Sequence, residues 1–404
     1  MPERSRRDVA LLTAGLSVST VGDSAALVAI LLELRAAGVG WVSAALGADL
    51  LPFILFASLS GRIVDRVDNR RLLVIALALQ GAVVLPLAFV REPLAVVVLV
   101  FAVASFSTVV RPATNAMVPV LAGEGRAPSA YAWVSTGTSI GFTAGYAAGG
   151  LLTAAFGVKG ALLADTATFA VLAVTCSRLS ATRSGGSSPD EGPRLGGMAI
   201  LWRNTVLRWS VLVTAVAVAC AVIDNVAAPF RFVDQLHTSS TGYGFYLAVW
   251  GAGSLVGAQI PRRIGVALMP AALAAGNAIS GLGIFGIGLA PTLGIALVAS
   301  AIGGVGNGIA NVAIAALVSG RVDESERGRA FASVSALIQT GVGVGTVAGA
   351  PLVAVFGAGH SMAGAGALTV VIGGATALWT FAHGQQQDGS STRHSAPSAS
   401  RRAR

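Results

Sequence analysis

Long apolar stretches alternate with short polar stretches along almost the whole chain. Each apolar stretch has roughly 20 residues or more, the length that an α-helix needs to cross the hydrocarbon core of a bilayer. We therefore expect an all-α membrane protein. The predicted transmembrane helices cover residues 9–33, 40–60, 72–90, 94–121, 129–156, 160–178, 207–232, 242–260, 265–289, 292–319, 329–355 and 361–382.

Two polar stretches divide this pattern. SATRSGGSSPDEGPRLGG, residues 180–197, is rich in Ser, Gly and Pro and predicts a flexible linker. The stretch from residue 383 onward lacks large apolar side chains and predicts a disordered tail. The predicted organisation is a six-helix bundle over 1–179, a cytoplasmic linker over 180–206, a second six-helix bundle over 207–382 and a disordered cytoplasmic tail over 383–404.

The two predicted bundles share faint sequence similarity. GYAAGGLLTAAFG in the fifth predicted helix resembles GTVAGAPLVAVFG in the eleventh. VGDSAA around Asp23 resembles VIDNVAA around Asp224, and each lies in the first helix of its half. Duplicated halves of six helices are one architecture of secondary transporters. We expect two pseudo-symmetric bundles around a shared central cavity.

Composition and charge support the membrane assignment. Charged residues make up 11% of the chain, whereas soluble proteins carry about 25%. The formal net charge is +9, but the basic residues follow topology, which argues against nucleic-acid binding. We expect a multi-pass protein of the plasma (inner) membrane with both termini cytoplasmic. With that orientation, every Lys and Arg lies at the cytoplasmic side or its edge except Arg35, Arg91, Arg111, Lys159 and Arg231.

Residue types that bind metals or carry out catalysis are scarce. The two cysteines, Cys176 and Cys220, lie inside apolar stretches, where packing explains them. The sequence contains no Gly-x-x-x-x-Gly-Lys-Ser/Thr loop, the motif that binds nucleotide phosphates. If the protein moves a solute across the membrane, the energy for that transport has to come from an ion gradient or from the gradient of the substrate itself. We predict no enzymatic activity, no metal and no cofactor. The histidines lie in predicted loops or the tail: His237, His360, His383 and His394.

The stretch SGRIVDRVDNRRLL, residues 60–73, concentrates charge between two apolar stretches. Gly61 permits close approach of another helix end, and Asp65 can accept hydrogen bonds at the N-terminus of a helix in the other half. Arg66 and Arg70 can bind Asp65 or facing acids. We expect a latch that closes the cytoplasmic side, with a plain positive-inside anchor as the alternative. The facing acids before the eleventh helix are Asp323, Glu324 and Glu326.

This stretch resembles the loop 2–3 signature of the major facilitator superfamily, Gly-x-Leu-Ala-Asp-Arg-x-Gly-Arg-Arg-x-x-Leu. Asp68 replaces the central glycine, as in drug:proton antiporters similar to macrolide and siderophore (enterobactin) exporters, and Asn69 replaces an arginine. The resemblance extends over nearly the whole chain, through RPATNAMVPVL and GVGNGIANVAIAALVSGRVDESERGRAF. It implies a monomeric, proton-coupled exporter of a lipophilic small molecule that works by alternating access. The matching positions are Gly61, Asp65, Arg66, Arg70 and Leu73.

Charged residues at membrane depth are costly and are candidates for function. The resemblance implies that the first, fourth, seventh and tenth helices line the central cavity. Asp23 and Asp224, with its neighbour Asn225, are our candidates for proton coupling or for contact with a cationic substrate. Arg111 is the expected partner that keeps one of them ionised. The alternative is that each aspartate only bonds a neighbouring hydroxyl or caps a helix break.

Two other acids, Asp49 and Asp165, lie on helices that usually mediate packing, and we expect a smaller role for them. GFTAGYAAGG in the fifth helix resembles the antiporter signature Gly-x-x-x-Gly-Pro-x-x-Gly-Gly, with Tyr146 in place of the proline. Glycines spaced by four provide a smooth face for tight helix crossing, and such a packing face also explains the stretch without antiport. The glycines that match are Gly141, Gly145, Gly149 and Gly150.

The direction of transport and the substrate stay open. A drug, an antibiotic or a secondary metabolite suits an exporter of this kind. Uptake of a nutrient or siderophore by the same fold, and a membrane receptor that no longer transports, fit the same sequence.

Overall fold

The structure is a computed structural model that describes residues 3–123, 125–180, 195–324 and 326–391, and these residues are helical apart from short connections. Most of the predicted linker (181–194) and the end of the predicted tail (392–404) lie outside them. The α-helices are α1 (Glu3–Arg35), α2 (Val39–Leu55), α3 (Ala57–Arg66), α4 (Asn69–Leu87), α5 (Pro93–Ala122), α6 (Ala127–Ser177), α7 (Leu195–Arg203), α8 (Thr205–Phe230), α9 (Ser240–Gly257), α10 (Met269–Leu289), α11 (Leu293–Arg321), α12 (Arg327–Phe356) and α13 (Ala358–Ser391). The short helical turns are η1 (Arg231–Gln235), η2 (Pro261–Arg263) and η3 (Val266–Leu268).

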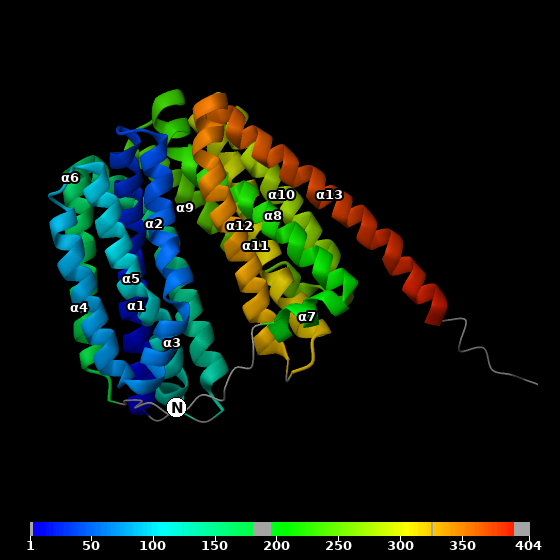
Figure 1. Cartoon of the computed structure of the whole chain (residues 1–404), viewed down its shortest axis with the longest axis horizontal. Helices are drawn as coiled ribbons and strands as arrows, with labels where there is room; N and C mark the ends of the chain where they lie inside the picture. Colours follow the sequence, from blue (N-terminus) through cyan, green and yellow to red (C-terminus); the bar gives the residue numbers. More distant parts are fainter. Residues whose placement is uncertain (1–2, 124, 181–194, 325, 392–404) are drawn as a thin grey trace, which may run out of the picture.

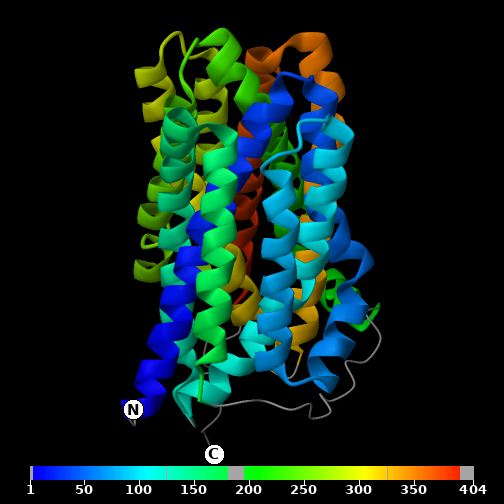
Figure 2. The same ribbon diagram turned by 90° about the vertical axis from the view of Figure 1, so that its left-hand side faces the viewer.

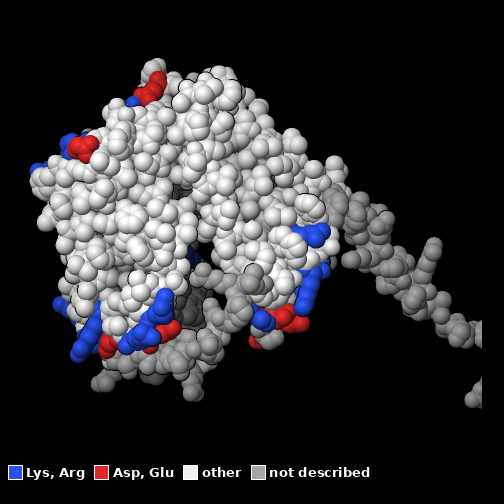
Figure 3. Space-filling model, in the orientation of Figure 1, with Lys and Arg blue, Asp and Glu red and all other residues white. Residues whose placement is uncertain are grey.

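Two helix bundles stand side by side (Figures 1 and 2). The first contains α1 to α6 and the second contains α8 to α13 (Figure 1). The bundles meet in the upper part of Figure 1 and diverge toward the end that carries the N-terminus. We call that end the basic face, because it carries the arginines of the stretch 60–73. It is separated from the opposite face by a broad band almost free of charge (Figure 3).

Helix α6 combines the fifth and sixth predicted helices. A straight helix of its 51 residues would measure roughly 75 Å, more than twice the hydrocarbon thickness. Gly157 interrupts it with φ 69° and ψ 180°, a backbone conformation that suits glycine. Both ends of α6 lie near the start of α1. Ser5 Oγ donates to the carbonyl oxygen of Ala122, just before α6, and the amide of Ser180, just after it, donates to Asp8. The chain therefore turns back at Gly157.

The second predicted helix is bent. Its two parts, α2 and α3, meet at a 55° angle at Phe56, one turn after Pro52, whose ring cannot continue a regular helix. Within the described residues, nine helices are long and apolar enough to cross a membrane, or ten if α2 and α3 form one span. The predicted number is twelve. The difference arises because α6 counts once and the 18-residue α9 is not among them.

The predicted glycine face lies at two helix contacts. Gly141, Gly145 and Gly149 of α6 face α1, where the Cβ of an alanine at Gly145 would lie 2.6 Å from the Val21 carbonyl oxygen. The same arrangement recurs in the second bundle, where Gly341, Gly345 and Gly349 of α12 face Ala215, Ala219 and Val226 of α8. The two seams correspond, as expected for duplicated halves.

Gly150 lies at a different contact, between the bundles. A Cβ at Gly150 would lie 2.6 Å from the Ser240 carbonyl oxygen and 2.9 Å from Gly244 Cα, both in α9. Nearby, Val28 of α1 is buried in one apolar cluster with Val226 of α8 and Tyr243 of α9. The halves are thus closely packed toward the opposite face.

The predicted linker and tail differ from the structure in part. Residues Leu195–Arg203 of the linker form α7, and Leu201 is fully buried, because the stretch MAILW gives this segment apolar side chains to bury. Helix α13 continues to Ser391, beyond residue 383 where we predicted the disordered tail to begin. The three consecutive glutamines after Gly384 favour helix once one has begun, so α13 extends past its apolar part.

Candidate functional site

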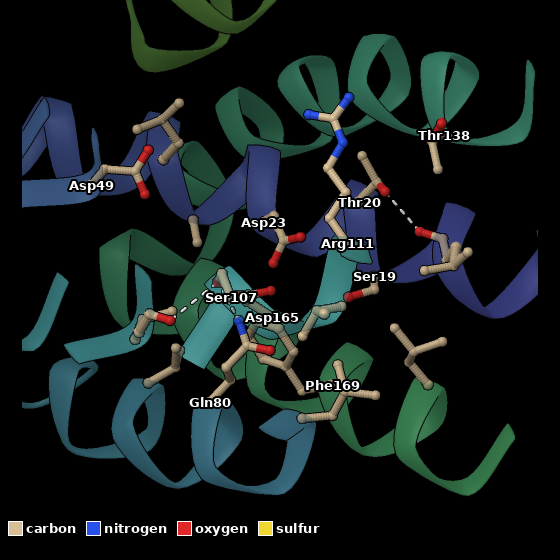
Figure 4. Close-up of a pocket in the computed structure, with 18 of the residues that line it drawn as sticks. Ser19, Thr20, Asp23, Asp49, Gln80, Ser107, Arg111, Thr138, Asp165 and Phe169 are labelled. Atoms are coloured by element: carbon tan, nitrogen blue, oxygen red, sulfur yellow. Dashed lines mark hydrogen bonds between the residues drawn. The ribbon is translucent and has the colours of Figure 1, made fainter. Parts of the chain in front are cut away.

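A cavity of about 670 Å³ lies within the first bundle, between α1, α2, α4, α5 and α6. All the described residues that line it fall between Leu16 and Leu172. We had predicted a cavity shared by both halves. The second bundle does not reach this one, because the bundles diverge toward the basic face. Aliphatic and aromatic side chains form most of the wall, and its main polar residues are Ser19, Thr20, Asp23, Asp49, Gln80, Ser107, Arg111, Thr114, Asn115, Ser135, Thr138 and Asp165 (Figure 4).

Three carboxyl groups face this cavity. Asp23 in α1 and Asp49 in α2 are exposed to it, whereas Asp165 in α6 is buried, with 2% of its surface exposed. The carboxyl of Asp23 is close enough to those of Asp49 and Asp165 for their charges to repel each other. Gly22 makes this proximity possible, since a side chain there would overlap the carboxylate of Asp165. Asp49 and Asp165, predicted as packing residues, therefore belong to the same site as Asp23.

Asp165 has one hydrogen-bond donor of its own. The hydroxyl of Thr168, one turn later in α6, lies 3.3 Å from the Asp165 carboxylate and 2.8 Å from its carbonyl oxygen. A shared hydroxyl leaves most of the carboxylate's capacity to accept hydrogen bonds unused. The bond from Thr168 therefore satisfies the Asp165 carboxylate only partly.

Arg111 lines the same cavity from α5 and is exposed. We predicted that it pairs with Asp23 or Asp224. Ion pairs among the described residues join Arg35 with Asp234, Arg91 with Glu33 and Arg329 with Glu326, and Arg111 is in none of these three. The structure therefore brings Asp23 and Arg111 to one cavity without joining them. The cavity holds three acidic groups and one basic group, which favours positively charged guests.

Gln80 is a site residue that our sequence reasoning missed. It lies in α4 at the cavity wall with 4% of its surface exposed, and its Nε2 donates to Ser107 Oγ over 2.5 Å. Its Oε1 is buried and has no hydrogen-bond donor among the described residues. The signal was present in the sequence: Gln80 is a polar amide in the middle of the apolar stretch LLVIALALQGAVVLPL.

Asp224 lies in the second bundle, away from this cavity. It is 4% exposed, and the hydroxyl of Tyr246 donates to its Oδ2, while Oδ1 has no partner in the part of the chain that the structure describes. Phe232 stacks on Tyr246 with ring centroids 4.3 Å apart and covers the pair. Asn225 is exposed and does not line the cavity. The structure therefore does not bring Asp224 or Asn225 together with Asp23 and Arg111.

Two residues of the charged stretch 60–73, Asp68 and Arg70, make contacts within the first bundle. The Asp68 carboxylate accepts from the amide of Arg71 over 3.1 Å and caps the start of α4. The guanidinium of Arg70 donates to the carbonyl oxygen of Ser177 at the end of α6. No described atom lies within 4 Å of the Cβ position of Gly61. The space that a second helix end would occupy in the predicted latch is therefore free in this state.

Comparison with known proteins shows what the chain is similar to. Residues 9–332 match the sequence profile of the Major Facilitator Superfamily. The multidrug efflux pump Tap of Mycobacterium tuberculosis (strain ATCC 25618 / H37Rv) is 26% identical over 408 residues, which cover 94% of each chain. An uncharacterised MFS-type transporter of Bacillus subtilis (strain 168), YfiS, is 24% identical over 386 residues, which cover 92% of each.

Solved structures share the fold. A mutant of the nucleoside transporter NupG has a TM-score of 0.76 at 13% identity, covering 93% of this chain and 100% of that one. A bacterial homologue of the human lysosomal transporter Spinster, inward-facing and unoccupied, has a TM-score of 0.71 at 13% identity, covering 95% and 98%. These similarities establish the fold. The substrate of this chain has to be inferred from its own residues.

Proposed function

Because the chain belongs to the Major Facilitator Superfamily, we propose that it is a proton-coupled exporter of lipophilic small molecules. The family consists of transporters and not of enzymes, so the chain is a membrane-embedded secondary transporter. Export, rather than uptake, is supported by the similarity to a multidrug efflux pump over 94% of the chain. The charged stretch 60–73, with Asp68 in place of glycine, points to the same branch.

The cavity of the first bundle carries this proposal. Its wall is mainly apolar, which suits a lipophilic body, and its carboxyl groups lie at membrane depth, where a charge needs a partner. A carboxyl in such a place exchanges a proton for a cationic guest without leaving an unpaired charge behind. We propose that Asp23, exposed at the cavity, carries out this exchange, and that Arg111 stabilises it as a carboxylate in the interval after its proton has left and before a guest has bound.

Asp224 and its neighbour Asn225 belong to the proposal in a second role. Asp224 occupies the position in α8 that corresponds to Asp23 in α1, but Tyr246 and Phe232 cover it in this state. We propose that a movement of α8 against α9 opens it to protons, and that Asn225 faces the space between the bundles. The two aspartates then titrate in different states of one cycle.

The topology that this function needs has twelve crossings. We propose that α6 crosses the membrane twice by turning at Gly157 and that α9 also crosses, with α2 and α3 forming one span. The excess of Lys and Arg at the basic face then puts both termini in the cytoplasm of a plasma-membrane protein. The protein acts as a monomer, with each half as one rocking body.

This state opens toward the basic face. The bundles are packed together at the opposite face through Gly150, Gly244 and Val28, and they diverge at the other end (Figure 1). We propose that the latch formed by Gly61, Asp65, Arg66 and Arg70 closes that end in the alternate state. Closure brings the second bundle against Gly61, whose Cβ position is unobstructed here.

The test uses purified protein in vesicles with an imposed pH gradient and a panel of fluorescent lipophilic compounds. We expect at least one compound to accumulate against its gradient when the lumen is acidic, and a protonophore to abolish the accumulation. Asp23→Asn should abolish it while the protein stays folded. Glu92→Gln, a cap of α5 at the opposite face, is the matched control and should transport normally. Uphill transport that survives in Asp23→Asn contradicts the assigned role.

A further inference from the structure

The strongest unexplained feature of the cavity is Gln80. Ser107 Oγ lies 3.1 Å from the carbonyl oxygen of Val103, to which it donates its only proton, so it acts as the acceptor for Gln80 Nε2. The nitrogen of Gln80 faces Ser107, and Oε1 faces away as a buried acceptor without a donor among the described residues. Buried acceptors are rarely left without a donor, so this atom needs an explanation.

The neighbours of Gln80 are also acceptors. Figure 4 shows the side chains of Gln80, Asp165 and Asp23 pointing toward one another at the cavity wall. An ionised carboxylate only accepts hydrogen bonds, and so does an amide oxygen. Thr168 supplies one shared hydroxyl to Asp165. The described basic group of the cavity, Arg111, is in no ion pair with these acids.

An array of acceptors with excess negative charge fits a guest that is both positively charged and a hydrogen-bond donor. Resting on the proposed function, we propose that Gln80, Asp165 and Asp23 form a binding site for lipophilic protonated amines, whose N–H groups donate to Gln80 Oε1 and a carboxylate. A quaternary ammonium ion carries the same charge but has no N–H to donate. The site should therefore distinguish the two classes, which an acidic cavity alone does not do.

The same geometry links binding to proton release. In the empty site, a proton on Asp165 or Asp23 gives the cluster a donor and reduces its charge. An incoming ammonium group replaces that proton, because it brings its own charge and its own N–H. The carboxyl O–H bond breaks, the proton passes to solvent, and the ammonium pairs with the carboxylate. Binding of the amine should therefore release a proton, which is the step that antiport requires.

The second bundle offers a matched control. Asn277 lies in α10, which corresponds to α4, and it is a buried amide with 5% of its surface exposed. Its Nδ2 lies 3.4 Å from Thr214 Oγ1, and it does not line the cavity. Asn277→Leu thus removes a buried membrane amide at the corresponding place without touching the proposed site.

The test compares two probes, 4-phenylbutylamine in its protonated form, which has N–H groups for both Gln80 Oε1 and a carboxylate, and its N,N,N-trimethylated quaternary analogue. Their affinities are measured by calorimetry on purified wild-type protein, Gln80→Leu and Asn277→Leu. We expect the wild type to bind the primary amine about tenfold more tightly, the value of one hydrogen bond to a charged group. Gln80→Leu should remove that preference by weakening the amine alone, whereas Asn277→Leu should keep it. Titrations in buffers of different ionisation enthalpy should show proton release.

Equal wild-type affinities for the two probes, or no binding of the amine, would overturn the inference without any variant. Equal weakening of both probes by Gln80→Leu would overturn it as well, since it marks Gln80 as a packing residue. If Gln80→Leu does not fold, Gln80→Glu serves instead and should retain the preference, because it keeps an acceptor. Proton-driven export of other compounds without amine preference would leave the proposed function standing. Amine preference without any transport would support this inference and contradict the proposed function.

Discussion

At the scale of single residues, Asp23 and Asp224 show how two corresponding acids acquire different surroundings. Asp23 is exposed to a cavity that also contains Asp49 and Asp165. Asp224 is enclosed, and Tyr246 is its hydrogen-bond donor. A buried carboxyl at membrane depth is stable only when it is neutral or well bonded. Tyr246 therefore stabilises the second bundle in this state, in addition to any part that Asp224 has in transport.

Tyr246→Phe tests this role. The substitution removes the hydroxyl that donates to Asp224 and keeps the ring that stacks on Phe232. Loss of a buried hydrogen bond to such a group costs about 1–3 kcal/mol. We expect the variant to lose its folded, monodisperse form at a lower temperature than the wild type, measured by size-exclusion chromatography after heating in detergent.

The control for this prediction is Tyr243→Phe. Tyr243 lies in the same aromatic cluster, 6.1 Å from Tyr246 between ring centroids, but its hydroxyl is not bonded to Asp224. It should change the heating profile much less. Equal losses in the two variants would show that general packing, and not the bond to Asp224, determines the stability of this region.

The sequence identified some of these groups and missed others for physical reasons. Rarity of charge at membrane depth was enough to select Asp23, Arg111 and Asp224. It did not show which of them share a cavity, because that depends on how helices rotate about their axes and on the state of the transporter. Gln80 escaped notice because an uncharged amide in an apolar stretch attracts less attention than a charge, although it too must be bonded when buried.

At the scale of helices, the contact between α1 and α6 depends on glycine. Gly141, Gly145 and Gly149 allow the backbone of α1 to approach α6 without any side chain between them. Asp165 lies in the part of α6 after the turn at Gly157, and there Gly22 of α1 provides the close contact that brings Asp23 near it. Helix α1 therefore packs closely against both parts of α6, through glycines on α6 before the turn and through Gly22 after it.

Gly145→Leu tests the seam. Already a Cβ at this position would lie 2.7 Å from Ser24 Cβ and 2.8 Å from Val21 Cα, so a leucine forces the helices apart. Overpacking of this kind costs about 1–3 kcal/mol, and we expect a clear loss of folded protein in detergent. Gly364→Leu in α13, whose Cβ position has no described atom within 4 Å, should leave the yield unchanged. Similar yields for both variants would contradict the proposed close packing.

Asp65→Asn, near the end of α3, tests the latch. The substitution removes a charge from the stretch 60–73 and leaves the helix-capping bond of Asp68 in place. We expect slower transport in vesicles, because the state that closes the basic face is weakened. Wild-type rates would instead support the plain positive-inside anchor.

Helix positions followed well from the apolar pattern, because length and hydropathy dominate in a bilayer. The stretch predicted over 94–121 corresponds to α5 at Pro93–Ala122. The bend between α2 and α3 was not predicted, although Pro52 marks its position. A proline in an apolar stretch does not by itself indicate a bend, because Pro86, Pro112 and Pro119 lie inside helices that continue without such a break. Helix α7 was not predicted, because the Ser, Gly and Pro residues of 180–197 led us to assign the whole segment up to residue 206 to a flexible linker.

At the scale of the whole molecule, the opposite face holds the two bundles together. Arg35 at the end of α1 forms an ion pair with Asp234 in η1, which belongs to the second bundle. The neighbouring Arg231 ties η1 to the end of α10, through a 3.2 Å bond to the Ile287 carbonyl oxygen. Asp234 is thus fixed within its own half, so the pair with Arg35 links one rigid bundle to the other. Alternating access requires this link to break in every cycle.

Crosslinking tests this requirement. In a protein whose Cys176 and Cys220 are replaced by Ala, the pair Arg35→Cys and Asp234→Cys should react with a short bifunctional thiol reagent. Transport in vesicles should then stop, because the opposite face cannot open. Reduction of a cleavable reagent should restore it.

The matched control is the pair Glu33→Cys and Arg91→Cys. Glu33 and Arg91 form an ion pair of 3.3 Å at the same face, but both belong to the first bundle. A crosslink there joins parts that move together, so transport should continue at the rate of the unreacted variant. If both crosslinks stop transport, the opposite face needs flexibility within one bundle. If neither does, the two halves do not separate at this face, and the rocking of rigid bundles is not the mechanism of this transporter.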